Sequence, residues 1–260
     1  MAVMTQDGAE IYFEDVNADS SKVVTLVNGH TRSSSDFRMM SRILGEAGFR
    51  VLALDNRGAG KSKVTRAFSI EDLCNDVVAL WDQLGIRNSS LLGISMGGFI
   101  SQGVAIKFPN RVEKLVLVST APEERFINPV GGGWISEGTK LEERMRTYFA
   151  PGFVERNPVL FKTMVTQIRQ SIEGTDFSQR SDMQRAALRG AGWHKDLGKI
   201  EAPTLIIHGK EDLVIDLEGA EKLRESIVDS QLIIIPSAGH LLLAEAPKEL
   251  YRIVQQFLSK

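Results

Sequence analysis

Residues 93–97 read Gly-Ile-Ser-Met-Gly, so one serine hydroxyl lies between two glycines. The apolar pair Leu91-Leu92 precedes this motif, and a helix-like stretch over 96–108 follows it. A strand that turns sharply into a helix leaves the Ser95 hydroxyl exposed at a tight bend, where glycines let neighbouring backbone pass close. The start of the helix also offers free N–H groups and a positive dipole end to an oxyanion. The pattern predicts nucleophilic attack by Ser95 on a carbonyl carbon.

A serine hydroxyl is a poor nucleophile until a base removes its proton, and His240 is the best candidate for that base. It follows the apolar run 232–235 and the loop 236–239, and it precedes a stretch that should open the last helix. The chain has four histidines, the others being His30, His194 and His208. We expect His208 to end a strand and His194 to be exposed.

The carboxylate that orients His240 is expected just upstream of it. Residues 204–212 read Thr-Leu-Ile-Ile-His-Gly-Lys-Glu-Asp, an apolar run that ends in two acids. Asp212 is the predicted acid, and Glu211 is a weaker alternative.

Five segments in this order resemble the α/β-hydrolase fold family over nearly the whole chain. They are Val-Asn-Gly-His at 27–30, Asp-Asn-Arg-Gly-Ala-Gly-Lys-Ser at 55–62, the serine motif, His-Gly-Lys-Glu-Asp at 208–212 and Gly-His at 239–240. The resemblance implies the chain order serine, acid, histidine. It also implies an oxyanion hole made by the backbone N–H groups of His30 and Met96. Some family members carry the acid after an earlier strand, which keeps Glu123 and Glu124 as alternatives.

The chain departs from the family pattern at two places. Asn28 stands where the family usually has histidine, and Val-Ile-Asp at 214–216 stands where it often has a proline. We expect Asn28 to alter the wall of the oxyanion loop. Gly29 is kept, and backbone donors do not depend on the neighbouring side chain.

The resemblance implies a serine hydrolase that cleaves a small, mostly neutral carboxylic ester or lactone through an acyl-enzyme. The neutral preference rests on two observations: the only cluster of basic residues beside the motifs is Arg32, Arg57 and Lys61, and the stretch over 122–192 is rich in Phe, Trp and Met. A carbon–carbon bond hydrolase or an acyltransferase on the same residues is the alternative. A non-catalytic ligand receptor is a weaker one, because fold does not fix function. Epoxide hydrolases and haloalkane dehalogenases of this fold need an aspartate where this chain has Ser95.

Strand-like and helix-like segments alternate along the chain, which predicts an α/β fold with a mostly parallel, doubly wound sheet. A hairpin near Asp7-Gly8 opens the chain, and Ser69 should cap a helix that stops near Gly85. Pro109 should end the helix after the serine. The remaining strands are expected at 22–27, 50–54, 89–93, 114–119, 204–208 and 231–235.

The stretch between 114–119 and 204–208 is too long for an ordinary connection through one helix. We therefore predict a core domain over 1–121 and 193–260 and a helical lid inserted after the sixth strand, over 122–192. The lid region is rich in aromatic residues and methionine, and we expect most of these to pack the lid and some to line an apolar pocket. They are Phe126, Trp134, Met145, Tyr148, Phe149, Phe153, Phe161, Met164, Met183 and Trp193.

Composition sets further limits. The 260 residues are 43% hydrophobic and carry a net charge of −2 without a basic stripe, so nucleic acid and anionic membranes are not expected as partners. We expect no cofactor and no metal, because Asp55 stands where a phosphate-binding loop needs glycine and no His or Cys pair has ligand spacing. A single cysteine and a start without signal-peptide features favour the cytoplasm. The sequence leaves the oligomeric state open.

Overall fold

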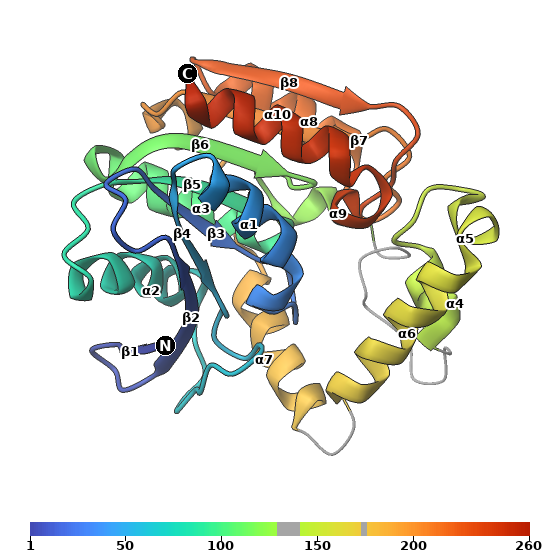
Figure 1. Ribbon diagram of the computed structural model, residues 1–260, viewed down its shortest axis with the longest axis horizontal. Coiled ribbons are helices and arrows are strands. Elements are labelled where there is room, and N and C mark those ends of the chain that lie inside the picture. The colour runs from blue at the N-terminus through green and yellow to red at the C-terminus, as the bar shows by residue number, and fades with distance from the viewer. Residues whose placement is uncertain (129–140, 173–175) are drawn as a thin grey trace.

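The computed structural model describes residues 1–128, 141–172 and 176–260, and a mixed eight-stranded sheet forms its centre (Figure 1). The strand order is β1-β2-β4-β3-β5-β6-β7-β8. The first two strands pair antiparallel, β2 runs antiparallel to β4, and the pairings from β4 to β8 are parallel. The expected strands are confirmed. They are β1 (Ala2–Met4), β2 (Glu10–Val16), β3 (Val23–Val27), β4 (Arg50–Leu54), β5 (Ser89–Ile94), β6 (Val112–Val118), β7 (Thr204–Gly209) and β8 (Ser230–Ile235).

Helices cover both faces of this sheet, which is the predicted α/β arrangement. One face packs against α1 (Arg38–Glu46), α9 (Leu242–Glu245) and α10 (Pro247–Ser259). The other packs against α2 (Ile70–Gln83), α3 (Met96–Lys107) and α8 (Leu217–Ser226). Short 3-10 turns lie at Ser34–Phe37, Pro109–Arg111, Glu124–Phe126 and Leu197–Lys199. Because both faces are covered, β3, β5 and β7 are buried along their whole length.

Local sequence signals fix the helix ends as expected. The Ser69 hydroxyl accepts a hydrogen bond from the Asp72 N–H, and the Asp72 side chain accepts one from the Ser69 N–H, which completes a capping box. Gly85 has a φ of 66°, a left-handed conformation that ends α2. Pro109 opens the turn that follows α3.

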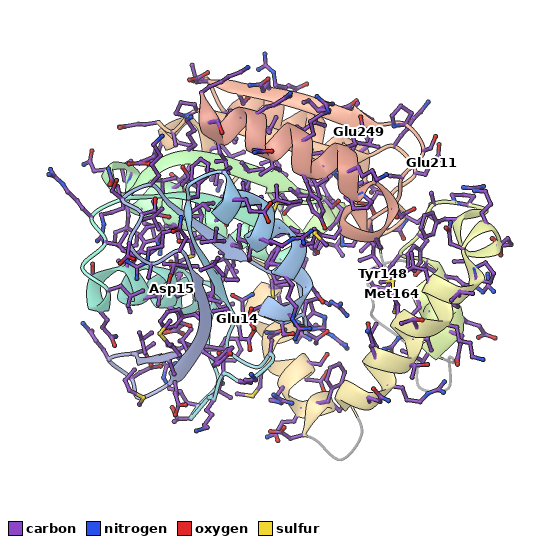
Figure 2. The ribbon with its side chains drawn as sticks, in the orientation of Figure 1. Glu14, Asp15, Tyr148, Met164, Glu211 and Glu249 are labelled. Atoms are coloured by element: carbon purple, nitrogen blue, oxygen red, sulfur yellow. The ribbon has the colours of Figure 1, made fainter. Side chains whose placement is uncertain are left out.

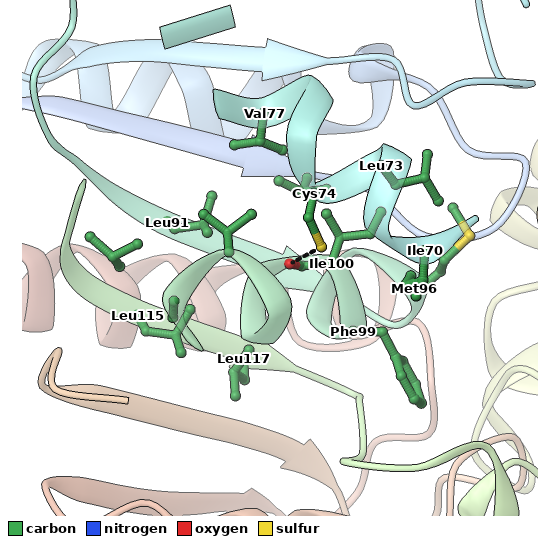
Figure 3. Packing of buried hydrophobic residues seen from close by; sticks show 14 of the residues in the cluster. Ile70, Leu73, Cys74, Val77, Leu91, Met96, Phe99, Ile100, Leu115 and Leu117 are labelled. Atoms are coloured by element: carbon green, nitrogen blue, oxygen red, sulfur yellow. Dashed lines mark hydrogen bonds between the residues drawn. The ribbon is translucent and has the colours of Figure 1, made fainter. Parts of the chain in front are cut away.

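The only cysteine belongs to the core between α2, α3 and the sheet (Figure 3). The Cys74 thiol donates to the Ile100 carbonyl at 3.4 Å. Burial raises the pKa of Cys74 to about 12, so the thiol stays protonated and unreactive.

Between β6 and β7 the described residues form four α-helices: α4 (Leu141–Arg146), α5 (Phe153–Arg156), α6 (Pro158–Ile172) and α7 (Phe177–Leu188). The first three share a small hydrophobic core of their own. In contrast, Ala187 and Leu188 of α7 join the main core. The lid and its boundaries at 122–192 stay a prediction, and Trp134 lies outside the described residues. Over 1–128, 141–172 and 176–260, no helix has the length and apolar character needed to cross a bilayer.

Candidate active site

Ser95 lies at the bend between β5 and α3, with φ at 54°. A non-glycine residue pays for this conformation with strain, which the surrounding backbone must hold in place. The neighbouring glycines make the bend possible, as the sequence predicts. A Cβ on Gly97 would overlap the Val27 carbonyl, and one on Gly93 would overlap the backbone of Gly97. The serine therefore stands where the backbone of β3, β5 and α3 converges.

The loops after β7 and β8 bring Asp212 and His240 to this serine. His240 Nε2 lies 3.1 Å from Ser95 Oγ, and His240 Nδ1 lies 2.9 Å from Asp212 Oδ2. An ionised carboxylate can only accept a hydrogen bond, so Nδ1 carries the proton and Nε2 is left to accept one from the serine. The three side chains thus form one hydrogen-bonded chain that can take a proton from Ser95.

The Asp212 carboxylate is buried and held on both of its oxygens. Oδ1 accepts from the N–H groups of Val214 at 2.8 Å and Ile215 at 3.0 Å. Burial by itself raises the pKa of Asp212, but the charge and hydrogen bond of His240 outweigh burial, with help from His208 and the Ile215 N–H. The net result is a pKa below the usual value, so the carboxylate is ionised at neutral pH.

His208 also lies against this carboxylate, with its Nε2 3.5 Å from Asp212 Oδ2. The same nitrogen donates to the Ile215 carbonyl at 3.1 Å. Burial lowers the pKa of His208, which keeps the ring neutral. Its Nδ1 is buried without a hydrogen-bond partner in the part of the chain that the structure describes.

The alternative acids lie elsewhere. Figure 2 shows Glu211 at the outer edge of the molecule, and its side chain is exposed. Glu123 forms ion pairs with Arg125 and His194, and Glu124 accepts a hydrogen bond from the Gly190 N–H. Of the acids considered from the sequence, Asp212 is the one that the structure places against His240.

The two residues expected to supply the oxyanion hole both belong to the cavity wall. His30 and Met96 both line it with Ser95, and within the described residues neither N–H has a hydrogen-bond partner. Asn28, which replaces the usual histidine, is buried and donates to the Ser33 carbonyl at 2.8 Å and to Asp36 at 3.0 Å. The departure at position 28 therefore ties the loop together internally.

Helix α7 holds the same loop in place by hydrogen bonds, and the sequence contains no signal that predicts them. Gln184 is fully buried, accepts from the Thr31 N–H at 2.7 Å and donates to the Arg57 carbonyl at 2.6 Å. His30 Nε2 lies 3.0 Å from the Ser181 carbonyl. Burial lowers the pKa of His30, so the ring is neutral and donates to that carbonyl.

A cavity of about 850 Å³ extends from Ser95 to the helices between β6 and β7. Of the aromatic and methionine side chains singled out there, Met145, Tyr148 and Met164 line it. Figure 2 shows Tyr148 and Met164 on the side of α4–α6 that faces the sheet. The others serve packing, as expected for most of them: Phe149, Phe153 and Phe161 in the core of α4–α6, and Phe126, Met183 and Trp193 in the main core.

The cavity carries more positive charge than the sequence suggests. Arg57 and Lys61 do not line it: Arg57 is buried in ion pairs with Asp7 and Asp76. Instead Arg144 and Arg185 line it together with Arg32. The charge-based premise for a mostly neutral substrate therefore fails, because it considered only basic residues near the motifs in sequence.

Nothing in the described part of the chain groups three or more His, Cys, Asp or Glu side chains in a way that could hold a metal ion. Asp55 accepts hydrogen bonds from the backbone N–H groups of Ser34 and Lys61, which ties the loop at 55–62 to the turn at Ser34–Phe37.

Comparison with known proteins gives one consistent result. Residues 22–247 match the family model described as alpha/beta hydrolase fold. A curated relative, 3-oxoadipate enol-lactonase 2 of Acinetobacter baylyi, is 29% identical over 81% of this chain and 79% of its own. A 2-hydroxy-6-oxononadienedioate/2-hydroxy-6-oxononatrienedioate hydrolase of Klebsiella pneumoniae is 27% identical over 93% and 88%. The solved esterase of Exiguobacterium antarcticum superposes with a TM-score of 0.85 at 25% identity, over 100% and 99%.

Proposed function

The chain belongs to the α/β-hydrolase fold family and is an enzyme of that family, and from this premise we propose that it cleaves a small carboxylic ester or lactone through Ser95, His240 and Asp212. The observation that carries the proposal is the hydrogen-bonded chain from Ser95 Oγ through the His240 ring to Asp212, at 3.1 and 2.9 Å. Ser95 and His240 line a cavity of about 850 Å³, which is large enough for a small-molecule substrate.

In the proposed first half-reaction, His240 Nε2 takes the Ser95 proton while Oγ attacks the carbonyl carbon. The N–H groups of His30 and Met96 hold the resulting oxyanion, and Asp212 stabilises the imidazolium. When the tetrahedral intermediate collapses, the alcohol leaves with the proton from His240. The acyl group stays on Ser95 as an ester.

In the second half-reaction, His240 takes a proton from water, and the hydroxide attacks the acyl carbonyl. Collapse returns the proton to Ser95 and releases the carboxylic acid. In a lactone the departing alcohol remains part of the acyl chain, so the same steps open the ring. Relatives named as an enol-lactonase and an esterase support both substrate types.

The test is hydrolysis of p-nitrophenyl butyrate and of a simple lactone by the purified protein, with Ser95→Ala as the control. We expect multiple turnovers by the wild type and none above background by the variant. Equal activity of the two proteins would overturn the assignment of Ser95. Product analysis with a β-diketone would identify carbon–carbon bond cleavage, which the Klebsiella relative's name makes the second candidate.

A further inference from the structure

Among the described residues that line the cavity, the charged side chains apart from His30 and His240 are three arginines and two carboxylates. Arg32 makes a two-pronged ion pair with Asp36, at 2.6 Å on both oxygens. Arg185 lies 3.5 Å from Asp182. The described part of the lining therefore holds one more guanidinium than carboxylates.

That extra cation is Arg144 on α4. Within 1–128, 141–172 and 176–260, no carboxylate forms an ion pair with its guanidinium, although the side chain is half-buried. Burial lowers the pKa of Arg144, and repulsion from Arg185 adds to the effect. A charged group in such surroundings is costly unless something pairs with it. The missing counter-charge can come from a bound molecule.

A tyrosine also lines this cavity. The ring of Tyr148 lines the cavity and meets the His240 ring edge-on, with centroids 5.7 Å apart. Its hydroxyl has no hydrogen-bond partner in the described residues. Burial raises the pKa of Tyr148 while the charges of Arg144, Arg185 and Arg32 oppose that rise. The phenol therefore interacts electrostatically with the three arginines, and it stays protonated, so it can donate a hydrogen bond.

We propose that Arg144, Arg185 and the Tyr148 hydroxyl bind a carboxylate group of the substrate. The guanidinium fork matches the two oxygens of a carboxylate, and a single surplus positive charge suits a monoanion better than a phosphate dianion. The inference rests on the proposed function and narrows it: the substrate is an ester or lactone that carries one carboxylate besides the bond to be cleaved.

The experiment compares anionic and neutral esters of equal chain length. Monoethyl esters of succinate, glutarate and adipate are paired with ethyl butyrate, valerate and hexanoate, and 4-acetoxybutyrate is paired with butyl acetate. The first set places the carboxylate on the acyl side and the second on the alcohol side. Proton release gives kcat/KM for the wild type, Arg144→Gln, Arg144→Lys and Arg156→Gln. Arg156 is the matched control, an exposed arginine on α5 that does not line the cavity.

We expect the wild type to prefer the anionic ester in at least one pair by about tenfold or more, because charge-assisted hydrogen bonds are lost with the neutral partner. Arg144→Gln should remove the preference by raising KM for the anionic esters. Arg144→Lys should restore part of it, and Arg156→Gln should behave as the wild type.

A binding measurement separates this site from the chemistry. Succinate, glutarate and adipate should raise the melting temperature of the Ser95→Ala variant. They should not raise that of the double variant Ser95→Ala, Arg144→Gln. Hydrolysis of the neutral esters without any preference for their anionic partners would overturn the carboxylate site and leave the proposed function standing. Dicarboxylate binding that depends on Arg144, in a protein that hydrolyses no ester, would overturn the proposed function and keep the site.

Discussion

Gln184 and Thr31 are joined by a 2.7 Å hydrogen bond between the side-chain carbonyl of the one and the backbone N–H of the other. Thr31 directly follows His30, the proposed oxyanion donor, and has a φ of 60°. Gln184 belongs to α7, which lies between β6 and β7 in the chain. The position of this helix and the position of the oxyanion loop are therefore linked by one buried amide.

Replacing Gln184 by alanine should lower kcat by about tenfold to a hundredfold while changing KM less, because a small displacement of the His30 N–H matters most in the transition state. Gln184→Glu keeps the acceptor for Thr31 and should recover part of the rate. Gln179→Ala on the exposed side of α7 is the control. Steady-state kinetics on p-nitrophenyl butyrate measure the effect, and an unchanged kcat in Gln184→Ala would mean that the loop holds its shape without the Gln184 side chain.

The nucleophile and the acid are tested together. Ser95→Ala should lose about 10⁴- to 10⁶-fold in kcat, and a serine-directed phosphonate should label Ser95 alone. Asp212→Asn should cost about 10⁴-fold, because the amide favours the wrong imidazole tautomer.

Glu124→Gln is the matched control for the acid, since it keeps an oxygen that can accept the Gly190 N–H. It should leave kcat nearly unchanged, and circular dichroism should show that all three variants are folded. A severe loss in Glu124→Gln with a mild one in Asp212→Asn would move the acid to the end of β6.

Acyl-chain preference follows from the cavity of about 850 Å³. Each methylene buried against apolar side chains contributes ~0.8 kcal/mol, or about fourfold in kcat/KM. We expect kcat/KM on p-nitrophenyl esters to rise from acetate to a short or medium chain and to fall for long chains, which exceed the cavity. A steady increase through palmitate would contradict this and indicate a lipase.

Stability should depend on pH through His208. Burial lowers its pKa in the folded protein, whereas in the unfolded chain a histidine titrates near about 6.5. Below that pH the unfolded state gains a proton that the folded state does not bind, so the free energy of unfolding falls as the solution becomes more acidic, by up to about 1.4 kcal/mol per pH unit. His208→Gln can still donate to the Ile215 carbonyl and should show a shallower fall.

Urea unfolding between pH 7.5 and 5.5 measures the two slopes. His194→Gln, at an exposed histidine, should keep the wild-type slope. Equal slopes for the wild type and His208→Gln would refute the neutral, buried state of this ring.

The parts of this molecule that local sequence determines were predictable. Ser69 and Asp72 specify a helix start by side-chain hydrogen bonds three residues apart. Gly93 and Gly97 mark the bend because no other residue fits there. Asp212 and His240 each follow a strand, and the carboxyl ends of neighbouring parallel strands lie side by side. Their meeting is a consequence of topology, which the strand pattern gives.

Arg144 and Gln184 had no such signal. Arg144 lies in a short run of charged residues that reads as an exposed helix face, and Gln184 lies in α7 among polar neighbours. What makes each of them important is the docking of its helix against the oxyanion loop or the cavity. That docking depends on tertiary packing far from the residue in sequence, so the charge of the cavity was misjudged.

The pairing of Leu115 with Thr204 places β7 beside β6 although the long segment with α4 to α7 separates the two strands in sequence. Closing a loop costs entropy only in proportion to the logarithm of its length, so each doubling adds about 0.6 kcal/mol. The segment can therefore change in size at little cost to the sheet. During synthesis, β1 to β6 leave the ribosome first, and these six strands are contiguous in the finished sheet. Asp212 and His240 join only when β7 and β8 add to the edge of that sheet. Catalytic activity should therefore appear only when β7 and β8 have joined the sheet, which is a late step in the folding of the newly made chain.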